Sequence, residues 1–459
     1  MDTLFSARAL MGLSLFFHTL FTPIGIGMPM LLFAAEGIGL KTGDERYRRL
    51  ARSWMPVVGL FFAVGALSGT ILSFELGLLW PKFMEYAGGI IGMPFSLEGF
   101  AFFTEAIFLA VYIYGWNRLS PRAHWLASIP LFVSAAVSAI FVISANAWMN
   151  DPAGFDVVNG QVVNVDPWAA MFNAAWLHEA IHGTLSAYVT TGFAVAGVYA
   201  LLAIRGRSDR QARLGMKVGM AMAAIAIPLQ IVSGDYAARK VAADQPLKFA
   251  AMESLQTTQA GAPIRIGGFP DGETMRFAIE IPKALSFLAH DNFDATVTGL
   301  DSVPARDRPP VAQTHLSFDV MVGSGFAMLG IAGWYWWLAW RRRSAFEPGR
   351  WLLRALALAG VLGFVATETG WFVTEFGRQP WVVRGFLRTA DGATTEPGID
   401  VFFVLFTLVY VAITAGLAFA LVKWPRPGGA APRPPGAAEA MSGGAGGPGA
   451  ARRSDSNVA

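Results

Sequence analysis

The sequence predicts an all-α, polytopic membrane protein with nine transmembrane helices. Its 459 residues are 54% hydrophobic and only 15% charged, and the mean hydropathy is +0.46. The chain also contains repeated apolar runs of the length that crosses a bilayer, which is about 20 residues for a helix. Backbone polar groups inside a bilayer must bond to one another, and helices satisfy this requirement within a single segment. We therefore expect a bundle of membrane-spanning helices.

The apolar runs define the expected elements. In chain order they cover residues 10–35, 54–80, 95–116, 125–149, 181–204, 216–232, 318–340, 352–373 and 401–422. We expect no cleavable signal peptide, because the first run is too long and no small-residue cleavage site follows it.

The segments between these runs alternate in charge. Basic residues gather in segments 41–52, 118–122, 205–217 and 341–354. Cytoplasmic loops of membrane proteins are enriched in Lys and Arg. We therefore expect these four segments and the tail after Lys423 in the cytoplasm. The N-terminus and the other connections should then lie outside.

Four connections are expected outside, and one of them is long enough to be a unit of its own. They cover residues 81–94, 150–180, 234–317 and 377–400. Long loops in compact proteins are usually functional or disordered. We divide the chain into helices one to six (1–233), the external loop (234–317), helices seven to nine (318–424) and a disordered cytoplasmic tail (425–459). The tail is rich in Gly, Ala and Pro, a composition that does not form a packed core.

The composition limits the possible cofactor ligands. The chain has no cysteine, so disulfides, thiolate-bound zinc and iron–sulfur clusters are excluded. A metal would have to bind the six histidines, the methionines or carboxylates.

The most informative stretch is ETGWFVTEFGRQPW, residues 368–381. Glu368 and Glu375 are seven residues apart and share one face of a helix, which Pro380 must end. Ionisable groups inside a membrane span are costly and usually functional. Arg378 could pair with Glu375 or with another carboxylate, such as a haem propionate.

Two further positions could hold a metal-containing cofactor. His18 lies in FFHTLFTPIGIGMP, where a buried imidazole is either hydrogen-bonded or metal-bound. The prolines and glycines beside it loosen the helix and suit a bulky planar ligand. Met321 is either packing material or a ligand beside the small residues 323–325. Because Met321 and His182 both lie near the outer end of their spans, they could form a His/Met axial pair of a low-spin haem.

His178, Glu179 and His182 spell H-E-A-I-H. On a helix, the two histidines could bind zinc with the glutamate as base, and this pattern defines the alternative function, an intramembrane zinc metalloprotease. No obvious third ligand follows, however. The other interpretation is that His178 is an interfacial polar residue and that only His182 is a ligand.

Glu98 and Glu105 lie seven residues apart in LEGFAFFTEA and share one face of the third span. Buried carboxylates at this spacing suit a proton relay. A structural hydrogen bond between helices is the alternative explanation.

Taken together, these motifs resemble subunit I of the cytochrome bd-type ubiquinol oxidases, in the short-quinol-loop branch often called cyanide-insensitive oxidases. The similarity runs from about residue 9 to residue 422. The motifs that carry it occur in the family's order: HTLFTP, EGFAFFTE, IHGTLSAYVTTG, KFAAME, FDVMVGSGFAML and GWFVTEFGRQPW.

The resemblance implies a set of haem-binding residues. His182 and Met321 would be the axial ligands of a low-spin haem b. His18 and Glu375 would serve a high-spin haem b and a haem d, the latter replaceable by another haem b. Trp371 would lie between the haems.

The resemblance also implies roles outside the iron ligands. Arg378 would lie near the haem propionates. Lys248 and Glu253 would belong to the site where quinol is bound and oxidised. Glu98 and Glu105 would deliver protons. One position departs from the family, because Asp319 stands where members carry a basic residue two places before the ligand methionine. We expect this departure to change the charge around the low-spin haem.

The implied function is that of a terminal oxidase. Quinol would be oxidised at the outer face, O2 would be reduced to water, and cytoplasmic protons would be consumed, so that charge crosses the membrane without pumping. The expected partners are ubiquinol or menaquinol, O2, membrane lipid, a second subunit and sometimes a single-span peptide. No nucleic acid is expected, and the location is the bacterial cytoplasmic (inner) membrane. A transporter or haem-carrying scaffold would share the helices but would not need Lys248 and Glu253.

Overall fold

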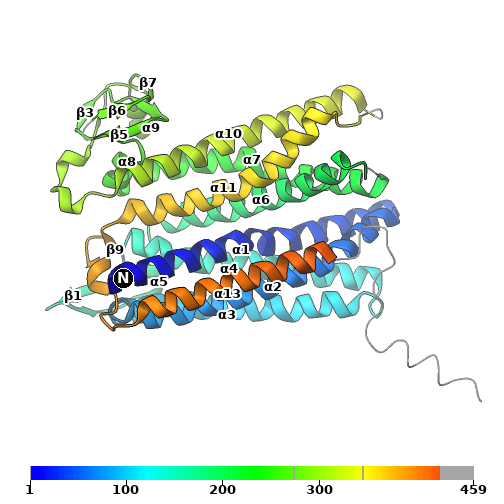
Figure 1. Ribbon diagram of the computed structural model, residues 1–459, viewed down its shortest axis with the longest axis horizontal. Coiled ribbons are helices and arrows are strands. Elements are labelled where there is room, and N and C mark those ends of the chain that lie inside the picture. Colours follow the sequence, from blue (N-terminus) through cyan, green and yellow to red (C-terminus); the bar gives the residue numbers. More distant parts are fainter. Residues whose placement is uncertain (1, 208, 272–273, 344–345, 424–459) are drawn as a thin grey trace, which may run out of the picture.

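Long helices run side by side along the long axis of the molecule (Figure 1). The computed structural model describes residues 2–207, 209–271, 274–343 and 346–423, and within these residues nine helices are long and apolar enough to cross a membrane. They are α1 (Thr3–Thr42), α2 (Glu45–Leu79), α3 (Pro81–Gly115), α4 (Pro121–Asn150), α6 (Trp176–Ile204), α7 (Arg210–Asp244), α10 (Val311–Arg342), α11 (Arg350–Arg378) and α13 (Ile399–Lys423). The number and order of the predicted spans are confirmed, and the predicted tail, 425–459, lies outside the described residues.

Several helices extend beyond the apolar runs that predict them. Segment 81–94, expected as an external connection, is instead the first part of α3, which begins at Pro81 directly after Trp80. Proline is well suited to the first position of a helix, where its missing N–H is not needed. Likewise α7 continues to Asp244. The predicted end of the helix before Pro380 is confirmed, since α11 ends at Arg378.

Short helices and strands form the connections at one end of the bundle (Figure 1). In the described part of the chain, the strands pair as five antiparallel two-stranded sheets, β1–β2, β3–β8, β4–β7, β5–β6 and β9–β10. Their bounds are β1 (Asp156–Val158), β2 (Gln161–Val163), β3 (Gln259–Ala260), β4 (Ile264–Ile266), β5 (Phe269–Asp271), β6 (Thr274–Arg276), β7 (Ile279–Ile281), β8 (Thr296–Val297), β9 (Trp381–Val383) and β10 (Leu387–Arg388). The short helices are α5 (Pro167–Met171), α8 (Pro246–Met252), α9 (Ala284–His290), α12 (Thr389–Gly392) and the 3-10 turns at Leu300–Ser302 and Ala305–Asp307.

Helix α1 joins two groups of helices. It packs against α2, α4 and α13 on one side and against α6 and α11 on the other. Thr19 of α1 lies 2.9 Å from both carboxyl oxygens of Glu368 on α11. This buried contact links the first helix to the motif that the sequence marks as most informative.

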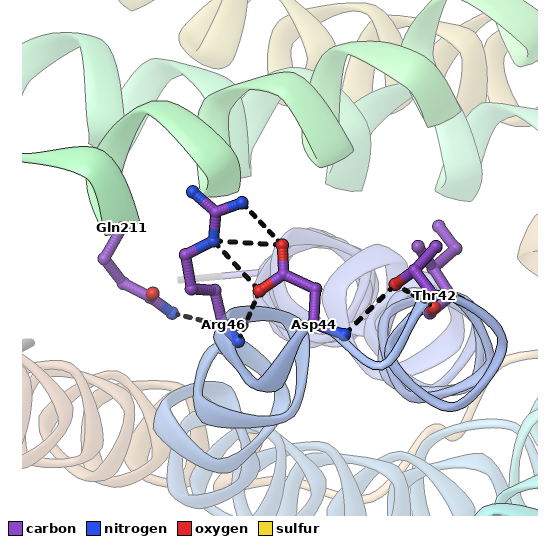
Figure 2. Close-up of polar contacts among 5 residues, drawn as sticks. Thr42, Asp44, Arg46 and Gln211 are labelled. Carbon is purple, nitrogen blue, oxygen red and sulfur yellow. Dashed lines mark hydrogen bonds and ion pairs between the residues drawn. The ribbon is translucent and has the colours of Figure 1, made fainter.

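At the other end of the bundle, polar contacts join the α1–α2 turn to the start of α7, as Figure 2 shows. Asp44 accepts hydrogen bonds from the Arg46 side chain, and Thr42 accepts from the Asp44 backbone N–H. Gln211 donates to the Arg46 carbonyl at 3.1 Å. Two of the basic segments predicted to be cytoplasmic therefore meet at one end; which membrane side this end faces stays a prediction.

A buried ionisable pair joins α1 to α4 near that end. Glu36 lies 2.9 Å from His124 Nδ1, and His124 Nε2 lies 2.8 Å from the Tyr112 carbonyl oxygen of α3. Both side chains are almost fully buried. Each side chain therefore provides the other with a hydrogen-bond partner in a region that water does not reach.

Removing one member of this pair should destabilise the bundle. We expect Glu36→Ala to lower the free energy of unfolding by about 3–5 kcal/mol, because an unpaired polar partner stays buried. The double variant Glu36→Leu/His124→Phe should recover most of this loss, since no unpaired group remains. Thermal unfolding in detergent, followed by tryptophan fluorescence, measures both. A double variant as unstable as Glu36→Ala would contradict this interpretation.

Candidate functional site

His182, on α6, is oriented by a serine on the neighbouring helix. Its Nδ1 lies 3.0 Å from the hydroxyl oxygen of Ser233 on α7. That hydroxyl donates its own proton to the Gln230 backbone carbonyl at 2.9 Å. The hydroxyl oxygen therefore accepts a hydrogen bond from the imidazole N–H. Nε2 is then the nitrogen with a free lone pair, as ligating histidines require. The side-chain amide nitrogen of Gln230 lies 3.0 Å from this nitrogen. This amide would have to move for an iron ion to bind there.

His18, on α1, is held in the same way. Its Nδ1 lies 2.9 Å from the hydroxyl oxygen of Ser68 on α2, and Ser68 donates to the Val64 carbonyl at 2.9 Å. The residue after each serine is a glycine. A Cβ at Gly69 would lie 3.3 Å from His18 Cε1, and one at Gly234 would lie 3.3 Å from His182 Cε1.

The repeated Ser-Gly arrangement was not anticipated from the sequence. In both helices the serine fixes the imidazole and the glycine lets the ring lie against the backbone. A Ser-Gly dipeptide inside an apolar helix is the signal that could have identified it.

Met321, on α10, packs directly on α11. A Cβ at Gly370 would lie only 3.1 Å from the Met321 sulfur, so the glycine favours this close approach. Trp371 follows Gly370 on α11. Helix α11 packs against α6 and α10, and α7 packs against both as well. His182 and Met321 therefore belong to one four-helix group.

Glu375 accepts a hydrogen bond at each of its two carboxyl oxygens. The Asn146 side-chain amide on α4 donates to one carboxyl oxygen at 2.8 Å, and Arg378 donates to the other at 2.7 Å. Arg378 is only 3% exposed, yet its Nε and Nη1 have no hydrogen-bond partner within the described residues. Two buried donors beside a carboxylate fit an additional anionic group, such as a propionate.

A chain of side-chain hydrogen bonds leads from the external loop to Glu375. Lys248 of α8 donates to the Asn150 side-chain oxygen at 2.6 Å, and the Asn150 amide donates to the Asn146 side-chain oxygen at 2.9 Å. Asn146 then donates to Glu375. Gly377 leaves room for the lysine, because a Cβ there would lie 2.6 Å from Lys248 Cγ. Burial lowers the pKa of the Lys248 ammonium, which Glu179 partly opposes.

Glu253, five residues after Lys248, faces different neighbours. It is 2% exposed and follows α8 directly. The pKa of Glu253 is raised to about 8, chiefly by burial and also by the negative charge of Asp319, while contacts with Arg265 partly oppose the shift. A carboxyl group titrating near neutral pH can accept and release a proton in the working range.

Glu98 and Glu105 lie on α3, as the sequence predicts. Ser138 of α4 donates to Glu98 at 3.1 Å, and Glu105 is buried. Helices α3 and α4 pack closely over their length. The contact with Ser138 is compatible with both interpretations, a proton relay and a helix–helix bond.

The zinc hypothesis lacks a third ligand. In the part of the chain that the structure describes, no three His, Cys, Asp or Glu side chains are grouped so as to hold a metal ion. His178 is buried, and His182 is bonded to Ser233 and Gln230 rather than paired with His178. The short H-E-A-I-H match is therefore explained by one oriented histidine.

The comparisons with known proteins agree on one family. Residues 6–428 match the family model described as cytochrome bd terminal oxidase subunit I. The chain is 38% identical to the putative cytochrome bd menaquinol oxidase subunit I of Bacillus subtilis, over 92% of this chain and 97% of that protein. It is 28% identical to the cytochrome bd-II ubiquinol oxidase subunit 1 of Escherichia coli, over 93% and 97%. The bd oxidase structure from Geobacillus thermodenitrificans superposes with a TM-score of 0.87 at 37% identity, covering 92% of this chain and 98% of that one.

The serine that orients His182 should be needed for tight binding of a metal-containing cofactor at this histidine. We expect Ser233→Ala to weaken cofactor retention by about 10- to 100-fold, the usual effect of losing a partner that orients a ligand. Optical titration of haem into the depleted protein measures this affinity. The matched control is Ser73→Ala on α2, whose exposed hydroxyl bonds to the Gly69 carbonyl of its own helix. Equal affinities for the two variants would argue against the orienting role.

Proposed function

Because the chain belongs to the cytochrome bd terminal oxidase subunit I family, we propose that it oxidises quinol at the outer membrane face and reduces O2 to water without pumping protons. Family membership makes it a multi-pass bacterial membrane oxidoreductase that uses haem and acts with quinol and O2. The finer assignments below are proposals about this chain's own residues. The observation that supports them best is the buried Arg378 beside Glu375, with two donors left over for an anionic cofactor group.

The proposed ligands of the low-spin haem b are His182 and Met321. Ser233 presents the Nε2 lone pair of His182, and Gly370 lets Met321 lie against α11. A His/Met pair is a recognised axial set for electron-transfer haem.

The proposed ligands of the other two haems, a high-spin haem b and a haem d or a haem b in its place, are His18 and Glu375. Ser68 orients His18. Asn146 and Arg378 hold the two oxygens of Glu375, which fixes this carboxylate in position. Trp371, one turn before Glu375, is placed between the haems in this proposal.

When bound, the haems would supply the transfer of electrons from quinol to O2. Glu253 would accept a proton from quinol, because its carboxyl group is buried but can ionise near neutral pH. Lys248 would help bind quinol and, through Asn150 and Asn146, support Glu375. Glu98 and Glu105 would carry cytoplasmic protons inward along the α3–α4 contact. Protons released outside and taken up inside would produce a charge difference without a pump.

The partners follow from the same family. Relatives of this chain are named as menaquinol and ubiquinol oxidase subunits, and we propose one of these two quinols as the substrate. We also propose a second subunit and, as an additional component, a single-span peptide, together with membrane lipid.

The first experiment is a dithionite-reduced minus oxidised optical spectrum of the purified complex. We expect a low-spin haem b signal that His182→Ala abolishes, and a chlorin band in the red if haem d is present. Glu375→Ala should lose a different haem signal and keep the low-spin band. A complex without haem would overturn the proposed function.

The second experiment tests Glu253 as the base. Protonated Glu253 cannot accept a proton, so kcat/KM for quinol should rise as the pH rises, with a midpoint at about 8. Oxygen consumption between pH 6 and 9 measures this profile. Glu253→Gln should lower the rate by about 100-fold, a usual contribution of general base catalysis, and remove the pH dependence. An unchanged profile in Glu253→Gln would rule out this role.

A further inference from the structure

His315, on the outer part of α10, is completely buried and bonded at both ring nitrogens. Its Nδ1 lies 2.7 Å from the Met252 carbonyl oxygen, and its Nε2 lies 3.1 Å from the Gly267 carbonyl oxygen. The side chain is 0% exposed. This residue has no part in the function proposed above.

Hydrogen-bond acceptors face both nitrogens of the ring. A carbonyl oxygen accepts hydrogen bonds and cannot donate one, so a ring nitrogen that carries a proton donates to the carbonyl beside it. Asp319, one helical turn further along α10, adds a carboxyl oxygen 3.4 Å from Nε2.

His315 and Asp319 together hold one peptide unit of the external loop. The Gly267 backbone N–H donates to Asp319 at 2.6 Å, and the Gly267 carbonyl faces His315. Gly267 has a φ of 68°, a left-handed conformation that favours glycine. The turn between β4 and β5 is thus fixed to α10 through both of its polar backbone groups.

The contact at Nδ1 reaches the base of the proposed quinol reaction. Met252, whose carbonyl faces His315, is the last residue of α8 and directly precedes Glu253. The backbone next to Glu253 and the turn at Gly267 therefore contact the same imidazole ring. Arg265, two residues before Gly267, donates to the Ser254 carbonyl at 2.9 Å and closes the ring of contacts around Glu253.

We propose that His315, together with Asp319, is a positioning residue that fixes the Glu253 carboxyl group where it meets quinol. This inference rests on the proposed role of Glu253 in quinol oxidation. It also accounts for the acidic residue at position 319, because a basic residue there could not accept from the Gly267 N–H.

The test compares His315→Gln with a matched control on the same loop. Glutamine can replace a hydrogen bond to one carbonyl but not the contacts of both ring nitrogens. We expect the KM for quinol to rise about tenfold, as for the loss of a buried hydrogen bond, with a smaller change in kcat. The reduced low-spin haem spectrum and the oxygen consumption with an artificial donor that bypasses the quinol site should be unchanged. His290→Gln, at the exposed end of α9, should behave as the wild type in every assay.

Hydrogen exchange provides a readout that does not depend on turnover. In His315→Gln and in Asp319→Asn, residues 253–254 and 264–268 should exchange faster, while the interior of α10 stays protected. Asparagine keeps an acceptor for the Gly267 N–H but carries no negative charge. Asp319→Asn therefore separates the effect of the charge at position 319 from that of this hydrogen bond. Unchanged exchange in both variants would overturn the proposal. An altered low-spin spectrum in His315→Gln would also overturn it, because His315 would then support Met321 rather than Glu253.

Activity measurements on two variants distinguish the role of Glu253 from that of His315. If Glu253→Gln oxidises quinol at the wild-type rate, the proposed role of Glu253 is wrong and the inference falls with it. If Glu253→Gln is inactive and His315→Gln retains the wild-type KM, only the positioning role is wrong.

Discussion

Unpaired polar groups are expensive to bury among apolar helices, and this constraint organises the whole functional region. The clearest case is Glu375, whose two oxygens accept from Asn146 and Arg378. The same chain of donors continues through Asn150 to Lys248. A charge that the chemistry needs is therefore supported by contacts from α4, α8 and α11, which are far apart in sequence.

The proposed haem-binding histidines follow one structural rule. Each imidazole donates to a serine on a neighbouring helix, and the glycine after that serine clears space for the ring. Because the serine hydroxyl is already committed to its own helix backbone, the tautomer is determined before any cofactor binds. Such preorganisation leaves less reorganisation for the binding step.

The external loop packs on the bundle through an apolar cluster that includes Phe249, Met252 and Leu285, and polar contacts with α10 hold it in addition. His315 and Asp319 hold the Gly267 turn, and His315 also holds the end of α8. Glu253 lies between these two attachments. Its environment therefore depends on α10, the helix that also carries Met321, so the proposed quinol and electron-transfer sites share a structural support.

The sequence by itself determined the nine helices, their order and the family, because apolar run length and motifs such as GWFVTEFGRQPW are local properties of the chain. It also marked Glu375, Arg378, His182 and Met321, since ionisable or ligating residues inside an apolar run stand out without a structure. The prediction was wrong for segment 81–94, which was expected as an external connection. This segment is instead the first part of α3, which begins at Pro81.

Only the tertiary structure decided which side chains meet. Ser68 and Ser233 look like ordinary helix serines until α2 and α7 pack beside the two histidines. His315 carries no sequence signal, because its contacts are two carbonyl oxygens that the fold brings from residues 63 and 48 positions away. Hydropathy and spacing report what one segment buries, whereas a buried polar group is satisfied by whichever segment packs against it.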